Sequence, residues 1–196
     1  MRESTFDRKT GETDVSVGIV LEGSGEYDVE TGCGFLNHML QLFAVHGRFD
    51  LKVKCVGDTE VDYHHTVEDV GLVLGRALSD ALANRAGIKR YGHVFIPMDE
   101  ALVLCAVDIS GRAALGYALD VPSQKIGDFD TELVKEFFTA LTRTLGAGVH
   151  LRSFCGENSH HIVEAAFKAF GRALAQAVAI DPTAAGRIPS SKGSLV

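Results

Sequence analysis

The chain has 196 residues, of which 46% are hydrophobic and 23% are charged, and its formal net charge is -7 at pH 7. This length and composition are typical of a globular protein with one domain or two small fused halves. The negative charge argues against a general nucleic-acid-binding protein, because such proteins need clustered positive charge to contact phosphates. The chain has no apolar run of about 20 residues and begins with a polar segment without a signal or transit peptide, so we expect no membrane association and a cytoplasmic location.

In the first half, the apolar pattern predicts strands over 14–20 and 49–56 and helices over 35–45 and 64–84, the second ending near Gly87. In the second half, we expect strands over 94–96, 101–109, 113–121 and 149–155 and helices over 132–145 and 160–179, the last capped by Asn158 or Ser159. The segment after Pro182 has no core pattern. Each half is then an α/β layered unit, with sheet on one side and helices on the other.

The four cysteines are widely separated and form no Cys-x-x-Cys pair. Their flanking residues are mostly apolar. We therefore expect buried, reduced thiols at Cys33, Cys55, Cys105 and Cys155, as is usual in the cytoplasm.

Two segments of the chain repeat each other 96 residues apart. The segment 64–78 begins with His-His-x-x-Glu and ends with Gly-Arg-Ala-Leu, and so does the segment 160–174. Eight of the 15 aligned residues are identical. This register indicates an internal duplication and a pseudo-twofold molecule. We expect a first repeat over 1–92, a second over 93–182, and a tail over 183–196.

The repeated motif is typical of a metal site. On a helix, residues three or four apart share a face, so His64 and His65 can each act together with Glu68. Adjacent histidines point about 100° apart, which suits two metal ions better than one. The second motif places His160, His161 and Glu164 in the same way. Imidazole and carboxylate together suit Mn, Fe, Zn, Co or Ni.

Further candidate ligands lie outside the repeated motif. His38 and His46 fall in the helix before the first motif, and the counterpart of His38 in the second half falls near Glu136, which is also a competent ligand. Asn37 precedes His38 and can orient its ring. Lys168 follows Glu164 by one helical turn, so a phosphate group near the metal ions is plausible.

The sequence resembles the imidazole-glycerol-phosphate dehydratase family from end to end. The resemblance rests on three motifs in order, together with Lys168-Ala169-Phe170 and the tail motif Ser190-Ser191-Lys192-Gly193. The three motifs are Gly32-x-Gly34-Phe35-Leu36-Asn37-His38, Asp62-x-His64-His65-Thr66-Val67-Glu68-Asp69 and Gly156-Glu157-Asn158-Ser159-His160-His161-Ile162-Val163-Glu164.

The resemblance implies a duplicated β-α-β fold and a lyase that removes water from D-erythro-imidazole-glycerol phosphate to give imidazole-acetol phosphate, in histidine biosynthesis. It implies two Mn(II) ions per active site, although other divalent transition metals would also fit, held between neighbouring subunits of trimers that form a shell of 24 subunits. The implied metal ligands are His38, His64, His65, Glu68, His160, His161 and Glu164, with Glu136 at the position of the remaining family ligand, which is often His. The family commonly has Asp before the first ligand histidine, where this chain has Asn37.

The resemblance also assigns residues to the substrate. Glu12 matches the position proposed for acid–base work, although the Gly11-Glu12 turn by itself indicates only an exposed carboxylate. The implied substrate-binding residues, chiefly for the phosphate, are Glu12, His38, His46, Arg90, Arg112, Lys168, Ser190, Ser191 and Lys192. With two metal ions on its imidazole, the substrate can lose its N–H and expel the adjacent hydroxyl.

The residues alone leave two other hypotheses about the function open. A dinuclear hydrolase would use the two ions to activate water and would not require an imidazole in its substrate. A metal-assembled structural shell would bind metal and assemble without any need for Glu12.

Overall fold

The computed structural model describes residues 1–184 and 186–195, and these form two similar halves. The first half contains β1 (Glu3–Lys9), β2 (Thr13–Val20), β3 (Tyr27–Glu30), α1 (Gly34–Gly47), β4 (Asp50–Gly57) and α2 (His64–Leu82). The second contains β5 (Tyr91–Met98), β6 (Ala101–Asp108), β7 (Ala114–Ala118), β8 (Lys125–Ile126), β9 (Phe129–Asp130), α3 (Glu132–Leu145), β10 (Gly148–Cys155) and α4 (Ser159–Val178). None of the helices in these ranges combines the length and apolarity needed to cross a membrane.

The two main sheets have the same topology. The first has the strand order β1-β2-β4-β3 and the second β5-β6-β10-β7. In each sheet the first three strands are antiparallel, and the fourth, β3 or β7, runs parallel to its neighbour. Strand for strand, β1 to β4 thus correspond to β5, β6, β7 and β10, and this match bears out the pseudo-twofold arrangement predicted from the repeat.

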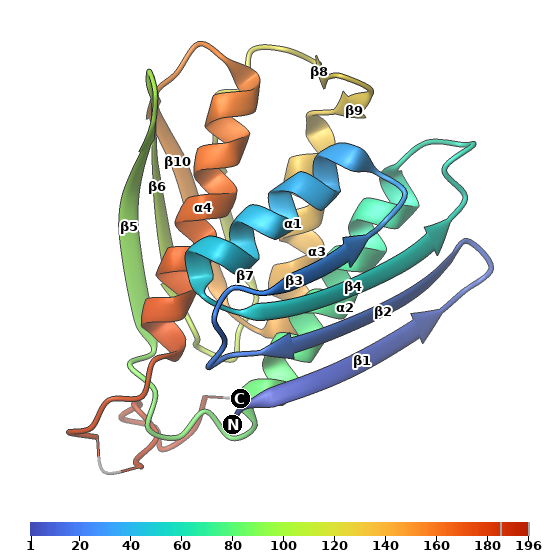
Figure 1. Ribbon diagram of the computed structural model, residues 1–196. Coiled ribbons are helices and arrows are strands. Elements are labelled where there is room, and N and C mark those ends of the chain that lie inside the picture. Colours follow the sequence, from blue (N-terminus) through green and yellow to red (C-terminus); the bar gives the residue numbers. More distant parts are fainter. Residues whose placement is uncertain (185, 196) are drawn as a thin grey trace.

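The helices of the two halves pack against each other between the sheets. In Figure 1, the sheet of the second half and the sheet of the first half lie on opposite sides of the molecule, and the four helices lie between them. The main helix pairs join the halves, because α2 packs on α3 and α1 packs on α4. The predicted layered α/β fold is confirmed, and each half contributes its own sheet as an outer layer.

The core follows from the alternation of apolar residues in the strands. In β2, Val15, Val17 and Ile19 are buried against the helices, and Leu51 and Val53 do the same in β4. Successive side chains of a strand point to opposite faces, so a period of two gives one buried face for each sheet. Full burial of each aliphatic side chain of this size contributes about 1.5–3 kcal/mol.

Glycine in the repeated Gly-Arg-Ala-Leu motif allows the helices to approach closely. A Cβ atom at Gly75 in α2 would lie 2.4 Å from the carbonyl oxygen of Leu141 in α3, and one at Gly171 in α4 would lie 2.7 Å from that of Phe43 in α1. Real Cβ contacts essentially never fall below 3.0 Å. The duplicated glycine therefore has the same packing function in both inter-half contacts.

Most predicted elements are confirmed, with α3 matching at both ends, but several details differ. Strands β1 and β3 and the β8–β9 hairpin were not predicted, and α2 ends at Leu82 with Ala83 as its C-cap, so the cap predicted at Gly87 is wrong. Asn158 caps α4 as expected, because its side chain accepts hydrogen bonds from the backbone N–H groups of His160 and His161.

One prediction about burial is wrong. Cys33, Cys55 and Cys105 are buried free thiols, but Cys155, the last residue of β10, is exposed. The tail, whose sequence has no core pattern, nevertheless contains a buried residue: Leu195 is buried, and its carbonyl oxygen accepts a hydrogen bond of 2.6 Å from the buried Arg85. A buried guanidinium needs acceptors, and this carbonyl supplies one.

We predict that Gly75→Ala destabilises the chain. The added methyl group would meet a backbone carbonyl that cannot move alone, and overpacking of this kind costs about 1–3 kcal/mol. That cost should exceed the gain of about 1 kcal/mol from replacing a helical glycine. The measurement is the thermal unfolding midpoint of the metal-free protein at fixed concentration. Gly34→Ala is the control, because a Cβ atom there has no neighbour within 4 Å; equal midpoints for the two variants would contradict the packing argument.

Candidate metal centre

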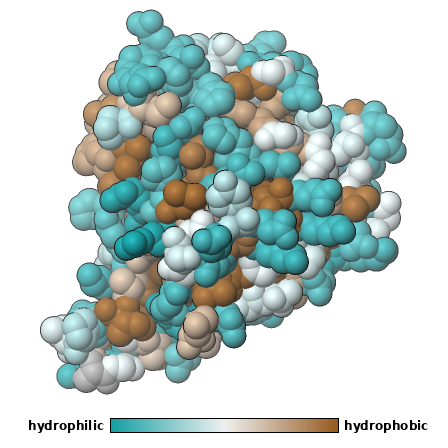
Figure 2. Space-filling view, in the orientation of Figure 1, coloured by the Kyte–Doolittle hydropathy of each residue, from teal (hydrophilic) through white to brown (hydrophobic). Residues whose placement is uncertain are grey.

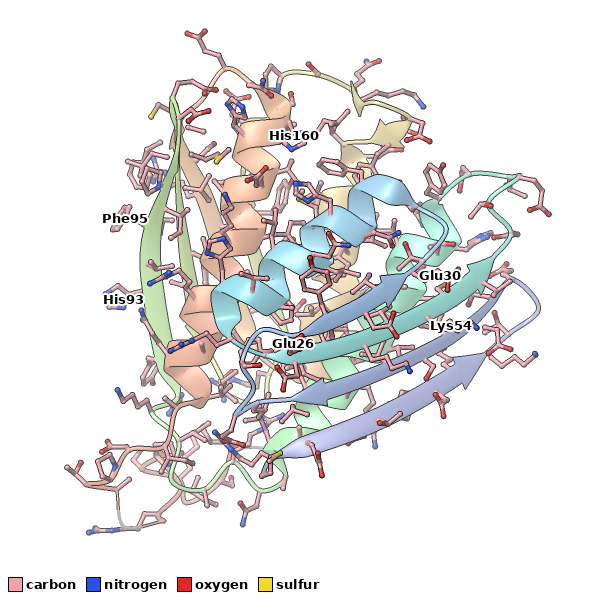
Figure 3. The ribbon with its side chains drawn as sticks, viewed as in Figure 1. Glu26, Glu30, Lys54, His93, Phe95 and His160 are labelled. Carbon is pink, nitrogen blue, oxygen red and sulfur yellow. The ribbon has the colours of Figure 1, made fainter. Side chains whose placement is uncertain are left out.

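The N-terminal ends of the helices gather at one end of the molecule. Phe35 in α1 packs edge-on against His160 at the start of α4, with ring centroids 5.3 Å apart, and also contacts Phe129, which lies just before α3. Tyr63, the N-cap of α2, donates a 2.8 Å hydrogen bond to Asp128 in the β8–β9 turn. The hairpin thus connects the helix ends that carry the paired histidines, and Figure 3 labels His160 near this end of α4.

Three ligand atoms converge between α1 and α4. Nε2 of His160 lies 3.1 Å from Oε2 of Glu164, and Nε2 of His38 lies 3.5 Å from the same oxygen. The potential ligand atoms of these three residues all lie within 4.8 Å of one another. Among the described residues, no other set of three or more His, Cys, Asp or Glu side chains brings its ligand atoms this close together. Two imidazole nitrogens and one carboxylate oxygen, with no thiolate, suit a divalent transition metal ion.

Glu164 is the buried member of this group. Its side chain is 10% exposed, and its second oxygen, Oε1, lies 2.5 Å from Nζ of Lys168. Burial by itself raises the pKa of a carboxyl group, but the contacts with Lys168, His38 and His160 reverse this and lower the pKa of Glu164. Glu164 is therefore a carboxylate at neutral pH, as a metal ligand must be.

Asn37, which precedes His38, faces the backbone. Its side-chain oxygen accepts hydrogen bonds from the backbone N–H and the hydroxyl of Thr31, at 2.9 and 2.6 Å. The amide group therefore ties the first turn of α1 to the segment that follows β3. Among its described contacts none involves the His38 ring, so the predicted orienting role has no support in this geometry.

The histidines of the first repeat lie apart from this group. Nε2 of His64 lies 3.9 Å from Oε2 of Glu68, one helical turn away, and Glu68 also pairs with Arg143 of α3 at 3.7 Å. The rings of His64 and His65 have centroids 6.0 Å apart and an interplanar angle of 87°. The rings of the second pair are 6.4 Å apart at 80°. Adjacent histidines thus diverge, as the rotation per helical residue requires. Glu136 lines a separate shallow cavity on α3.

His65 and His161 each have a carboxylate on Nδ1. Asp58 lies 2.9 Å from Nδ1 of His65, and Glu100 lies 2.7 Å from Nδ1 of His161. These hydrogen bonds raise the pKa of both histidines. The hydrogen bond with His161, together with two backbone N–H donors, lowers the pKa of Glu100 to about 2. With Nδ1 bound in this way, Nε2 is the nitrogen left for a metal ion.

Glu12 lies beside the first-repeat histidines. It occupies the turn between β1 and β2, and its side chain is 57% exposed. One carboxylate oxygen of Glu12 is 3.7 Å from Nε2 of His65. The exposed carboxylate is therefore next to the ring nitrogen that a metal ion would use.

The predicted phosphate-binding residues fall into two groups. Arg90 pairs with Asp108 at 2.8 Å and donates a 2.9 Å hydrogen bond to the carbonyl oxygen of Pro189, the residue just before the tail residues Ser190, Ser191 and Lys192. Arg112 lies in the turn after β6, where its guanidinium contacts the Ser110 carbonyl. Lys168 instead belongs to the α1–α4 group.

His46 lies at the other end of α1, near positive side chains. Burial lowers its pKa, and Lys168 and Arg172 lower it further. It lines a cavity of about 580 Å³ with Arg48, Lys89 and Arg172. This position favours the neutral imidazole and an anionic neighbour.

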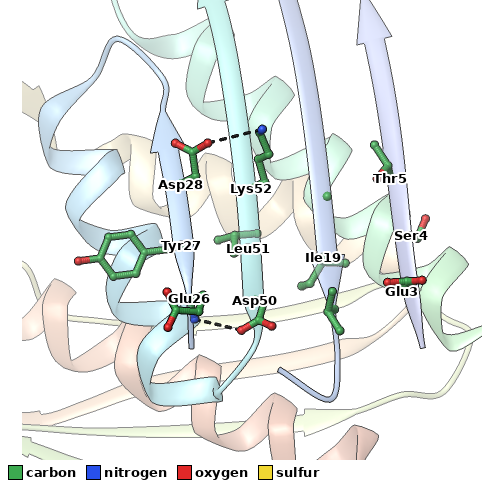
Figure 4. A pocket seen from close by; sticks show the side chains of 12 residues that line it. Glu3, Ser4, Thr5, Ile19, Glu26, Tyr27, Asp28, Asp50, Leu51 and Lys52 are labelled. Carbon is green, nitrogen blue, oxygen red and sulfur yellow. Dashed lines mark hydrogen bonds and ion pairs between the residues drawn. The ribbon is translucent and has the colours of Figure 1, made fainter. Parts of the chain in front are cut away.

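A second hollow of about 580 Å³ lies on the face of the first sheet turned away from the helices. Figure 4 shows it across β3, β4, β2 and β1, with Lys52 paired to Asp28 at 3.6 Å. It has no histidine or cysteine among its lining residues. This hollow therefore lacks the combination of imidazole and carboxylate groups that the repeated motifs predict for a metal site.

Sequence reasoning missed Glu100 and Asp58. Glu100 immediately precedes β6, just as Glu12 immediately precedes β2, so the two are structural counterparts in the duplicated halves. An alignment of the two strand pairs would have revealed Glu100. Asp58 immediately follows β4, while Gly156 immediately follows β10, so no repeat signal pointed to Asp58.

Comparisons with known proteins agree with this arrangement. A family model described as imidazoleglycerol-phosphate dehydratase matches residues 31–174. The imidazoleglycerol-phosphate dehydratase of Desulforamulus reducens is 55% identical over 194 residues, covering 99% of this chain and 98% of that protein. The protein of the same name from Synechococcus sp. WH7803 is 56% identical and covers 100% of this chain and 96% of its own length.

Solved structures give the same answer. The crystal structure of imidazoleglycerol-phosphate dehydratase from Staphylococcus aureus has a TM-score of 0.83 and 38% identity, and the match covers 91% of this chain and 99% of that one. The Pyrococcus furiosus enzyme in complex with (S)-C348 has a TM-score of 0.84 and 37% identity, with coverage of 97% and 100%. Sequence, fold and histidine geometry agree, and the chain therefore belongs to the imidazoleglycerol-phosphate dehydratase family, whose members are hydro-lyases.

Proposed function

We propose that this chain removes water from D-erythro-imidazole-glycerol phosphate to give imidazole-acetol phosphate, in the pathway to histidine, with two Mn(II) ions in each active site. The observation that carries the proposal is the convergence of His38, His160 and Glu164 on one point between α1 and α4. The carboxylate is ionised and the three donors match the chemistry of a divalent transition metal ion. Other divalent transition metals would also fit this donor set.

The internal symmetry supports a second ligand group. Helix α3 begins and ends 98 residues after α1, so Glu136 is the counterpart of His38. The repeated motifs make His64 and Glu68 the counterparts of His160 and Glu164. We therefore assign Glu136, His64 and Glu68 to the second ion. His65 and His161, whose Nε2 atoms make no hydrogen bond among the described residues, would complete the two coordination shells.

Neighbouring copies of the chain would supply these completing ligands. Within the described residues, no ion pair joins the group around Glu12 and His65 to the group around His38 and Glu164. We therefore propose that each active site combines residues of two copies, within trimers that build a 24-subunit shell. An exposed aromatic pair, Phe95 and Phe154, on the second sheet supports self-association.

The visible surface fits a protein that associates with itself through limited patches. Figure 2 shows a largely hydrophilic face with hydrophobic side chains in small separate groups. The net charge of -7 gives no basis for nucleic-acid binding. Free thiols at all four cysteines fit our assignment of the enzyme to the cytoplasm.

The chain's own residues then have distinct functions in dehydration. The reaction removes a hydroxyl group from one carbon and a proton from its neighbour, and we assign the proton transfers to Glu12. The phosphate would be held by basic and hydroxyl side chains: Arg90, Arg112, Ser190, Ser191 and Lys192, with Lys168 and His46. Two divalent ions, when bound, would stabilise the deprotonated imidazole of the substrate.

Removal of metal should abolish turnover. Protein stripped with a chelator is expected to form no imidazole-acetol phosphate from imidazole-glycerol phosphate, and added Mn(II) should restore product formation. A phosphate monoester without an imidazole serves as the control substrate. Full activity of the stripped protein would contradict the metal-dependent mechanism, and equal activity on the control substrate would favour a dinuclear hydrolase.

Glu12→Gln should lower kcat by about 10²–10⁴-fold, because a positioned general acid–base contributes this much. Glutamine has nearly the same shape, so manganese content and assembly should stay unchanged. Glu30→Gln, an exposed change of the same type on β3, is the matched control. A Glu12→Gln enzyme with the kcat of the wild type would remove Glu12 from the mechanism.

Mixed assemblies test whether sites combine residues from two copies. Glu12→Gln chains and His160→Ala chains are each expected to be inactive alone. After unfolding and joint refolding in equal amounts, about a quarter of the sites should receive both intact residues if these come from different copies. Activity should then return to about a quarter of the wild-type value. If both residues belong to the same copy, the mixture stays inactive.

A further inference from the structure

Glu100 divides its two carboxylate oxygens between the backbone and a histidine. Oε1 accepts hydrogen bonds from the backbone N–H groups of Glu157 (3.1 Å) and Asn158 (2.8 Å), the loop that leads into α4. Oε2 lies 2.7 Å from Nδ1 of His161. The carboxylate is thus anchored on one side, and its other side faces the ring of a proposed metal ligand.

The counterpart of Glu100 in the first half has a different environment. Glu12 precedes β2 as Glu100 precedes β6, but Glu12 lies near Nε2 of His65, at 3.7 Å, and makes no contact with Nδ1. Asp58 occupies Nδ1 of His65 instead, at 2.9 Å. The duplicated glutamate has therefore diverged, because Asp58 orients the first-repeat histidine and leaves Glu12 free.

We propose that Glu100 is a positioning residue that holds His161 in the Nδ1–H tautomer, so that the Nε2 lone pair is available to a metal ion. The inference rests on the proposed dimetal function. A neutral imidazole carries one N–H, and only its unprotonated nitrogen can ligate. A carboxylate can only accept a hydrogen bond, so contact with Oε2 requires the proton on Nδ1 and leaves Nε2 free.

The variant Glu100→Gln distinguishes a role in positioning His161 from a purely structural role of Glu100. The glutamine oxygen can keep both backbone hydrogen bonds, so the loop before α4 stays anchored. The amide NH₂ then replaces Oε2, and two donors cannot face each other. His161 must therefore move its proton to Nε2 or turn away, and in either case it loses its ligand atom.

The test is manganese binding to metal-stripped protein, measured as affinity and stoichiometry. Glu100→Gln is expected to bind one of the two ions about 10–100-fold more weakly than the wild type, since loss of a residue that orients a ligand typically costs this much. Glu157→Gln, a change of the same type in the same loop, should bind both ions as the wild type does. His161→Ala gives the reference for loss of the ligand itself.

The outcomes distinguish the two proposals. Wild-type protein that binds no manganese would overturn the proposed function. Wild-type protein that binds two ions, together with a folded Glu100→Gln variant of unchanged affinity, would overturn only the assignment of Glu100. A crystal structure of the manganese-loaded wild type tests the inference without a variant. The inference is supported if Nε2 of His161 binds the ion while Nδ1 contacts Glu100. It is overturned if His161 binds the ion through Nδ1.

Discussion

The close contact between α1 and α4 is the constraint on which the rest of the site depends. His38 belongs to the first half and Glu164 to the second, so the ligand group exists only where the halves meet. Gly171 permits this contact, because a Cβ atom there would lie 2.7 Å from the carbonyl oxygen of Phe43. Close packing of the helices brings Nε2 of His38 within 3.5 Å of the Glu164 carboxylate. The packing of α1 on α4 therefore also brings these three potential ligands together.

Duplication explains both the regularity and the exceptions of the site. The scaffold is repeated strand for strand, and the helices α2 and α4 begin with the same motif. Single positions differ between the halves: Glu136 stands where the first half has His38, and Glu12 and Glu100 are the same residue type with different neighbours. A scaffold that holds a position rigidly in both halves allows one copy to change its role without loss of the fold.

The sequence predicted what is periodic and missed what depends on tertiary contact. Helix α3 has a clear apolar stripe and was predicted at both ends, and the spacing of His160 and Glu164 predicted their contact. Strand β1 lies at a sheet edge, and no residue of it is fully buried, so alternation gave no signal. Strand β3 has only 4 residues. The burial of Leu195 follows no local pattern, and its carbonyl oxygen is bonded to Arg85, 110 residues away in the sequence.

The electrostatic problem of the site explains its many carboxylates. Each helix N-terminus carries roughly half a positive charge, which would oppose the cations that we propose at the start of α2 and α4. Each of the four paired histidines has a carboxylate within 3.9 Å that offsets this charge: Glu68 at His64, Asp58 at His65, Glu164 at His160 and Glu100 at His161.

Two of these carboxylates share one further feature. Glu164 gives one oxygen to Lys168 and the other to the histidines, and Glu100 gives one oxygen to backbone N–H groups and the other to His161. Anchoring one oxygen fixes the direction of the other, so less side-chain freedom remains to be lost when a ligand group closes on an ion. In this structure, one oxygen of each carboxylate is therefore already directed at a histidine.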